Sequence, residues 1–304
     1  MARKREKGWP PPPEPLGDGV ELVDNHTHLL SAVDVLPEGE AVPTASEEIA
    51  WARAAGVTRL VQVACDVDAI EPGLALARDH AEVVLAVAIH PNEAVLHAGI
   101  HEVAPDGLDP DPRARHELSL DEAIDAVARA ARTDRVRAIG ETGLDHFRGG
   151  ERGRAAQRES FRAHIALAKE LGLPLQIHDR EAHAEVVEIL LADGAPDATV
   201  FHCFSGDAAM ARVCVENGWY LSIAGPVTFR ANDDGRDAVR VAPLERLLLE
   251  TDAPYLTPHP YRGRPNGPYL LPHTLREVAR VRDESVAHVA AVTTATAVDL
   301  YGPW

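Results

Sequence analysis

The feature of this chain that most restricts its fold is a series of short apolar runs, separated by segments with helical patterning. Such runs, rich in β-branched residues or leucine, are typical of buried strands in a parallel sheet, and the helical segments between them are typical of βα units. The eight runs are residues 20–26, 59–66, 83–90, 136–143, 173–179, 199–204, 219–225 and 246–252. Eight βα units predict an α/β fold, a (β/α)8 TIM barrel that forms a single domain.

The segments between the runs carry the start and stop signals of helices. Residues 155–171 place Phe161, Ile165 and Ala168 at helical spacing, so this stripe is expected to face the sheet. Amino-terminal caps are expected at Thr44, Ser119 and Asp207, and carboxyl-terminal caps at Gly172, Gly194 and Gly218. Two helices, near 272–282 and 284–299, are expected to close the chain.

The domain organisation follows from the absence of an internal Pro/Gly-rich linker. Residues 20–304 are expected to form the barrel domain. Residues 1–19 contain a basic run followed by four consecutive prolines, which predicts a disordered tail. Residues 91–118 are long and rich in Asp, Pro and His for a βα connection, and are a candidate lid. A doubly wound open sheet is the alternative fold, but the sequence has neither G-x-G-x-x-G after the first run nor a P-loop.

Charge and cysteine content limit the possible functions. The formal net charge of −18 argues against a passive nucleic-acid binder, unless bound metal ions supply positive charge locally. Three cysteines without a CxxC spacing indicate neither a disulfide framework nor a thiolate zinc site, which favours a cytoplasmic protein. No apolar run has the length of a membrane span, and neither a signal peptide nor an obligate protein partner is indicated.

Polar residues stand at the ends of the predicted strands: His26, His28, His90, Glu141, Asp145, His178, His202, Glu250 and Asp252. Because the active site of a (β/α)8 barrel forms at the carboxyl ends of its strands, these side chains are expected to converge. Four imidazoles and two carboxylates among them would be costly to bury without a partner ion, which predicts a metal centre. Six ligands exceed what one tetrahedral ion takes, so two divalent ions are expected.

The ligand chemistry leaves the identity of the metal open. Imidazole and carboxylate suit Mg, Mn and Zn alike, and no thiolate belongs to the set. Cys203 directly follows His202, so it is expected to point away from the site as an apolar packing residue. No serine stands in a G-x-S-x-G motif, which disfavours a Ser-His-Asp hydrolase.

Several segments together give the chain a specific resemblance to a known family. They are "DNHTHL", "AIGETGLDHF", "QIHDREA", "FHCFSG", "LLLETDAPYL" and "RGRPNGP", in that order. In these motifs, from about residue 20 to the C-terminus, the chain resembles the TatD-type metal-dependent deoxyribonucleases of the amidohydrolase superfamily. The resemblance implies a (β/α)8 barrel that binds two divalent ions and hydrolyses DNA phosphodiester bonds, as a 3′ to 5′ exonuclease on single-stranded or damaged DNA.

The resemblance also implies roles for individual residues. The first ion would be held by His26, His28, Glu141 and Asp252, and the second by Glu141, His178 and His202. Glu141 and Asp252 are implied as catalytic residues, with Asp252 taking a proton from a metal-activated water. Glu250 is expected either to orient ligands and substrate or to form an ordinary salt bridge with a helix.

Substrate contacts are expected from residues that follow the ligand motifs. The candidates are His90, Arg180, Arg262, Arg264 and Tyr255, with the rings of Phe147, Phe204 and Phe229 either stacking on bases or packing under loops. The chain departs from the family's usual pattern at Asn25, Asn92, His146 and Asp179. None of these is an implied metal ligand, so the departures bear on substrate choice.

Two alternative functions stay open at this point. The same metal site could hydrolyse a different bond, such as the ester in aminoacyl-tRNA editing, an amide or a small phosphate ester. A degenerate barrel could also bind metal as a non-catalytic scaffold, although the intact ligand set argues against that.

Overall fold

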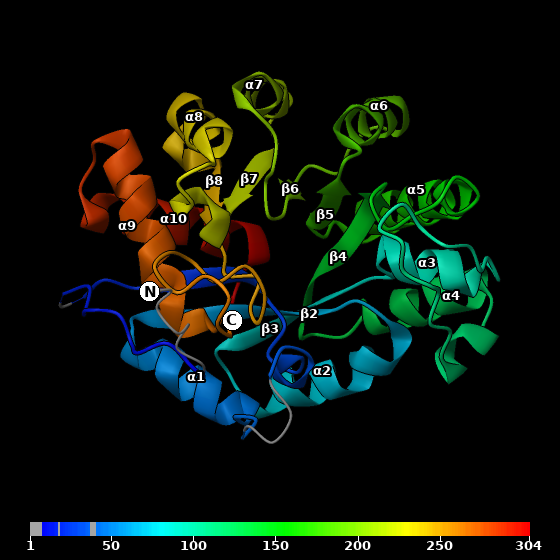
Figure 1. Cartoon of the computed structure of the whole chain (residues 1–304), viewed down its shortest axis with the longest axis horizontal. Helices are drawn as coiled ribbons and strands as arrows, with labels where there is room; N and C mark the ends of the chain where they lie inside the picture. The colour runs from blue at the N-terminus through cyan, green and yellow to red at the C-terminus, as the bar shows by residue number, and fades with distance from the viewer. Residues whose placement is uncertain (1–7, 18, 37–40) are drawn as a thin grey trace, which may run out of the picture.

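The fold was examined in a computed structural model, which describes residues 8–17, 19–36 and 41–304. Eight strands form one sheet in the order β1 to β8, and every neighbouring pair is parallel (Figure 1). The strands are β1 Leu22–Thr27, β2 Val57–Ala64, β3 Val83–Val87, β4 Val136–Asp145, β5 Leu175–Arg180, β6 Thr199–Phe201, β7 Tyr220–Ile223 and β8 Leu247–Leu249. Each lies within or overlaps a predicted run, which confirms the (β/α)8 barrel.

The sheet curves until its last strand approaches its first. Backbone bonds cross this seam just beyond β8: the amide of Asp252 donates to the carbonyl of His26 over 3.0 Å, and that of His28 donates to Ala253 over 2.7 Å. The Asp24 carboxylate, fully buried at the same seam, accepts from the Thr251 amide over 2.9 Å. The two motifs that carry His26, His28 and Asp252 are therefore joined through their backbones.

Helices surround the strands on the outside (Figure 1). The α-helices are α1 Ala45–Ala54, α2 Val67–Asp79, α3 Pro91–His97, α4 Leu120–Ala130, α5 Gly153–Leu171, α6 His183–Asp193, α7 Ala208–Glu216, α8 Asp233–Val241, α9 Leu271–Arg282 and α10 Val286–Tyr301. Short 3-10 turns lie at Ala32–Asp34, Ala114–Glu117, Gly225–Thr228, Leu244–Arg246 and Pro268–Leu270. The predicted caps at Thr44, Ser119 and Asp207 are confirmed, because each side chain accepts a bond from the first turn of its helix.

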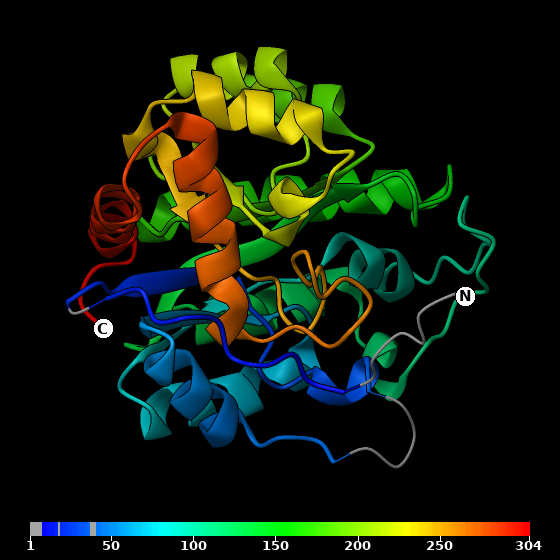
Figure 2. The same ribbon diagram turned by 60° about the vertical axis from the view of Figure 1, so that its left-hand side comes forward.

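Alternating residues of the strands build two separate cores. One side of each strand, with Leu60, Leu85 and Ile139, packs against the helices. The other side fills the barrel interior with Val61, Val63, Val84, Ala86, Ala138, Val200 and Leu248. Ala297 and Tyr301 of α10 pack against this inner cluster, so α10 covers one end of the barrel (Figure 2).

A buried polar network lies between α10 and the strand ends. The Tyr301 hydroxyl donates to Asn25 Oδ1 and accepts from Gln176 Nε2 over 2.9 Å. The same amide nitrogen of Gln176 donates to the Asn25 carbonyl over 2.8 Å, and Asn25 Nδ2 donates to Ser222 Oγ over 2.8 Å. Residues far apart in the chain, on β1, β5, β7 and α10, are thereby held in one arrangement.

The segment before β1 differs from the prediction of a disordered tail. Residues 1–7 and 18 lie outside the described residues, but residues 8–17 lie against the barrel. Trp9 meets the ring of Trp51 edge-on at 5.6 Å, and the Tyr269 hydroxyl donates to the Pro10 carbonyl over 2.7 Å. The prolines thus form a strap anchored by Trp9, because buried aromatic surface and hydrogen bonds compensate for the cost of ordering the chain.

The candidate lid of residues 91–118 is also more structured than expected. It begins with α3, and its later part is tied back to that helix, since Arg115 donates to Glu93 over 2.6 Å. Glu102, in the middle of the segment, accepts from the Gly153 amide at the start of α5 over 2.7 Å. These contacts attach the segment to two helices.

The part of the chain that the structure describes contains no helix with the length and apolarity of a membrane span.

The polar network under the strand ends predicts a specific loss of stability. Replacing Tyr301→Phe removes the only hydroxyl that bonds Asn25 Oδ1 and leaves that buried oxygen without a donor among the described residues. Urea unfolding should show a free energy of unfolding lower by about 1–3 kcal/mol. Tyr220→Phe is the control, because its hydroxyl has no hydrogen-bond partner within the described ranges. Equal stability of Tyr301→Phe and the unmodified protein would contradict this account.

Glu48 on α1 predicts a pH dependence of stability. Its side chain is 2% exposed, and burial raises its pKa to about 8 from 4.5. The folded state therefore favours the protonated acid, so Glu48 should cost stability as pH rises from about 5 to about 8, by up to about 1.4 kcal/mol per pH unit. Glu48→Gln stays neutral. Its melting temperature should rise relative to the unmodified protein across this range.

Glu71→Gln, an exposed change on α2, is the control for that measurement. A constant difference between Glu48→Gln and the unmodified protein from pH 5 to pH 8 would show that the Glu48 carboxylate is solvated.

Candidate metal centre

The barrel brings the predicted ligands together at the carboxyl ends of its strands. His26 comes from β1, with His28 one residue beyond its end, Glu141 from β4 and His178 from β5. His202 and Asp252 stand one and three residues beyond the ends of β6 and β8. Two groups within this set, His26–His202–Asp252 and His26–His28–Glu141, and a third that includes the neighbouring His90, His90–Glu141–His178, have the spacing needed to hold a metal ion.

Glu141 is the common member of the site. One carboxylate oxygen, Oε1, lies 3.5 Å from His28 Nε2 and 3.6 Å from His26 Nε2. The other, Oε2, lies 3.0 Å from His202 Nε2 and 3.1 Å from His178 Nδ1. Burial by itself would raise the pKa of Glu141, but the surrounding imidazoles hold it well below its usual value. One ionised carboxylate therefore faces two separate pairs of imidazoles.

His26 is prepared to act as a metal ligand. Its Nδ1 lies 2.9 Å from Gln176 Oε1, and the amide nitrogen of Gln176 is already engaged elsewhere, so Nδ1 carries the proton. The lone pair then resides on Nε2. This atom is buried, lies 3.9 Å from Asp252 Oδ1 and has no hydrogen-bond partner among the described residues. A buried, unpaired acceptor is costly unless a cation uses it, so the residues present fit a metal ion.

His202 is oriented by a carboxylate in a similar way. Its Nδ1 lies 3.1 Å from Glu250 Oε1, and its Nε2 faces Glu141. Glu250 is fully buried and also accepts from the Cys203 amide over 2.7 Å. Of the two expectations for Glu250, the structure therefore favours orientation of a ligand over a salt bridge to a helix.

The same pattern recurs at His178. Its Nε2 lies 3.2 Å from Asp145 Oδ2, while its Nδ1 faces Glu141. Burial alone would lower the pKa of His178, but the bonds to Asp145 and Glu141 raise it to about 9. Asp145 is fixed in turn by the amides of Phe147 and Arg148, at 3.0 and 2.8 Å. Asp145, which was predicted only to converge on the site, positions a ligand.

His90 stands beside the ligands and presents a donor to them. Its Nδ1 accepts from the Asn92 amide over 3.1 Å and so caps α3, which leaves the proton of the neutral ring on Nε2. That nitrogen lies 3.3 Å from His178 Nδ1 and 3.8 Å from Glu141 Oε2. Burial and the neighbouring His178 lower its pKa to about 4.

Asp252 lies at the rim of the site. Its Oδ1 is 3.3 Å from His28 Nε2, and 13% of its side chain is exposed. The backbone has a φ of 52°, in the left-handed region that aspartate tolerates better than most residues. This turn directly after β8 points the carboxylate at the imidazoles of β1.

Sequence reasoning missed two residues of the site, Gln176 and Cys65, and used an argument for Cys203 that does not apply. Cys65 follows β2, and its thiol donates to Glu141 Oε1 over 3.2 Å; its place at a strand end was the available signal. Cys203 was expected to point away from the site by strand alternation. That argument does not apply, because β6 ends at Phe201 and Cys203 has a φ of 42°, outside any strand. Cys203 lines a pocket beside the site.

The predicted substrate residues are spread around this centre. Arg180 lies over the ring of Phe147 at 4.0 Å, and Tyr255 meets His28 edge-on at 6.0 Å. Arg262 lies over the ring of Phe229 at 4.6 Å. Arg264 instead donates to the Gly8 carbonyl over 2.9 Å, so its side chain holds the strap before β1.

Comparisons with known proteins identify relatives of this chain. The model of the family described as TatD related DNase matches residues 23–302. A Mycobacterium tuberculosis protein named uncharacterized metal-dependent hydrolase TatD is 42% identical over 92% of this chain and 98% of its own length. A Cronobacter sakazakii protein named 3'-5' ssDNA/RNA exonuclease TatD is 36% identical over 84% of this chain and 90% of its own.

The same relationship appears in three dimensions. The crystal structure of YJJV, a TatD homolog from Escherichia coli, matches with a TM-score of 0.76 and 25% identity, covering 93% of this chain and 98% of that one. The resemblance predicted from the motifs is thus confirmed. The chain belongs to the TatD related DNase family and is a metal-dependent hydrolase.

Proposed function

We propose that this protein is a nuclease that depends on divalent metal ions and hydrolyses phosphodiester bonds of single-stranded or damaged DNA from the 3′ end. The observation that carries the proposal is the Glu141 carboxylate, whose two oxygens face two separate pairs of imidazoles. This is the arrangement that a pair of bridged ions requires. Relatives from Cronobacter sakazakii and Erwinia amylovora are named 3'-5' ssDNA/RNA exonucleases, which supports a nucleic-acid substrate.

We assign two divalent ions, drawn from Mg, Mn and Zn, to this centre. His26, His28, Glu141 and Asp252 would hold the first ion, and Glu141, His178 and His202 the second, as the distances between these side chains allow. Such ions, when bound, lower the pKa of water and stabilise negative charge on phosphoryl oxygens. Gln176, Glu250 and Asp145 fix the orientation of the imidazoles, so little rearrangement is needed when metal binds.

The chain's own residues supply the remaining chemistry. Asp252, at the rim of the site, accepts the proton of the attacking water. The oxygen of that water bonds to phosphorus, the bond from phosphorus to the leaving sugar oxygen breaks, and that oxygen takes up a proton, which restores the balance left by the one that Asp252 accepted. His90 offers its Nε2 proton to a phosphoryl oxygen. Cys65 and Cys203 do not act as nucleophiles, because burial and nearby carboxylates raise the pKa of both thiols well above the usual value.

Local positive charge allows an acidic protein to hold DNA. The chain has a net charge of −18, which would repel a polyanion at a distance. Arg180 and Arg262 are exposed near the centre, each stacked on a phenylalanine ring, and neither pairs with a carboxylate within the described ranges. We assign these two guanidinium groups to the phosphates that flank the scissile bond.

The proposed reaction predicts a large effect of Asp252→Asn. With Mg²⁺ or Mn²⁺, the unmodified protein should release nucleotides from the 3′ end of labelled single-stranded DNA. Loss of the proton acceptor should slow that release by about 100-fold or more. Asp299→Asn, an exposed change on α10, is the control. If the unmodified protein releases no nucleotides, the nuclease proposal fails, and activity on RNA, esters or small phosphate esters would name the alternative substrate.

The assignment of ions predicts distinct metal contents for ligand variants. Elemental analysis of purified protein should find two ions per chain, close to one in His202→Ala and less than one in Glu141→Ala, because Glu141 serves both positions. His101→Ala, an exposed change in the coil after α3, should keep two ions. Two ions in Glu141→Ala would show that this carboxylate does not bridge them.

A further inference from the structure

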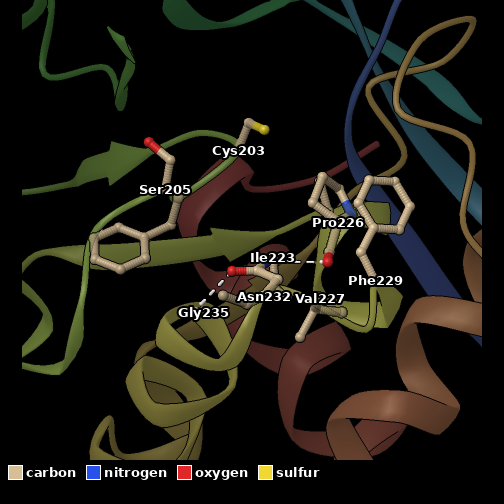
Figure 3. A pocket seen from close by; sticks show the side chains of 10 residues that line it. Cys203, Ser205, Ile223, Pro226, Val227, Phe229, Asn232 and Gly235 are labelled. Carbon is tan, nitrogen blue, oxygen red and sulfur yellow. Dashed lines mark hydrogen bonds between the residues drawn. The ribbon is translucent and has the colours of Figure 1, made fainter. Parts of the chain in front are cut away.

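A pocket of about 270 Å³ opens beside the candidate metal centre, between the ends of β6 and β7 and the start of α8. Its walls include Phe204, Ile223, Val227 and Phe229, with Ser205 and Asn232 as polar members. In Figure 3, Phe229 and Ser205 lie on opposite sides, and Asn232 lies below them. The pocket is largely apolar, and nothing in the proposed reaction at the metal centre uses it.

The pocket and the metal centre share a wall. Cys203 lines the pocket and directly follows the ligand His202. A single carboxylate oxygen, Glu250 Oε1, holds both residues, since it accepts from the Cys203 amide over 2.7 Å and lies 3.1 Å from His202 Nδ1. Burial raises the pKa of the Cys203 thiol, and the nearby carboxylates of Glu250, Asp252 and Glu141 raise it further. A molecule in this pocket is therefore adjacent to any bond cleaved at the centre.

The floor of the pocket is held in shape by its own hydrogen bonds. Asn232 Nδ2 donates to the Pro226 carbonyl over 3.0 Å, and Asn232 Oδ1 accepts from the Gly235 amide over 3.1 Å, as the dashed lines in Figure 3 show. With its amide occupied, Asn232 supports the walls and leaves them apolar. A preformed apolar pocket with aromatic walls suits a flat heterocycle, because ring stacking tolerates every base.

A cation stands at the edge of the same pocket. The Arg262 guanidinium lies 4.6 Å from the centre of the Phe229 ring and is exposed. It forms no ion pair with any carboxylate of residues 8–17, 19–36 and 41–304. An apolar pocket bordered by a positive charge matches a molecule with a flat apolar part and an adjoining anion, and a nucleotide has both.

We propose that this pocket binds the base of the nucleotide at the 3′ end, with its phosphodiester bond lying over the metal centre. The inference rests on the proposed nuclease function. One base fills the pocket, Arg262 contacts the adjoining phosphate, and the strand continues outward past Arg180. The pocket thereby adds binding energy for a terminal base without selecting its identity.

The test compares strands that differ only at the last nucleotide. One oligonucleotide ends in a normal nucleotide and the other in an abasic sugar. For Phe229→Leu, which keeps an apolar side chain but removes the ring, KM for the normal strand should rise about 10-fold, as expected for loss of one stacking contact. KM for the abasic strand should not change. Phe204→Leu should behave in the same way, whereas Leu191→Ala, exposed on α6, should leave both values unchanged.

A binding measurement separates failure of the pocket from failure of the nuclease function. In the Asp252→Asn background, an oligonucleotide ending in 2-aminopurine should lose fluorescence on binding, and the loss should disappear when Phe229→Leu is added. Equal effects of Phe229→Leu on normal and abasic strands, or unchanged quenching, would overturn the pocket assignment. If the unmodified protein cleaves neither strand, the nuclease proposal fails, and the quenching experiment alone decides whether the pocket binds a base.

Discussion

The structure depends on one buried carboxylate placed among imidazoles. Glu141, 5% exposed, lies within β4 and directs its two oxygens at His26 and His28 on one side and at His178 and His202 on the other. An ionised group in such a place is tolerated only when opposite charge and hydrogen bonds repay its desolvation. The strands must therefore place their imidazoles at the same level of the barrel. Closure of the sheet brings these strands into that arrangement.

Residues that are not ligands carry much of this precision. Each imidazole is oriented by a contact to the ring nitrogen that faces away from Glu141 or Asp252. The partners are Gln176 for His26, Glu250 for His202 and Asp145 for His178. Gln176 is itself fixed by Tyr301, near the C-terminus of the chain. Helix α10 thus does more than cover the barrel, because its last residue takes part in the network under a candidate metal ligand. Stability of the fold and orientation of the site draw on the same hydrogen bonds.

The proposed function requires an acidic chain to hold an acidic substrate, and the surroundings of the centre are suited to that. Carboxylates outnumber basic residues strongly, yet two exposed guanidinium groups, those of Arg180 and Arg262, lie near the candidate centre, each over an aromatic ring. Cations bound by the imidazoles and carboxylates would extend this positive region into the interior. The pocket lined by Phe204 and Phe229 adds an apolar surface beside this positive region. Charge and aromatic surface are in this way combined within the reach of one nucleotide.

The sequence by itself determined the number of βα units, the family and the six candidate ligands, because strands are short periodic segments and the candidate residues lie at or near their ends. Only the tertiary structure decided which atoms face each other.

Cys65 and Gln176 enter the site through contacts with Glu141 and His26, far away in the chain, and no local pattern reports such contacts. Strand alternation could not place Cys203, because β6 ends at Phe201 and a left-handed residue redirects the backbone. The order of the proline-rich strap was likewise hidden, since it rests on Trp51 and Tyr269 elsewhere in the chain. Local periodicity can be read from neighbouring residues in the sequence, whereas contacts between residues that closure of the barrel brings together are defined only in the folded chain.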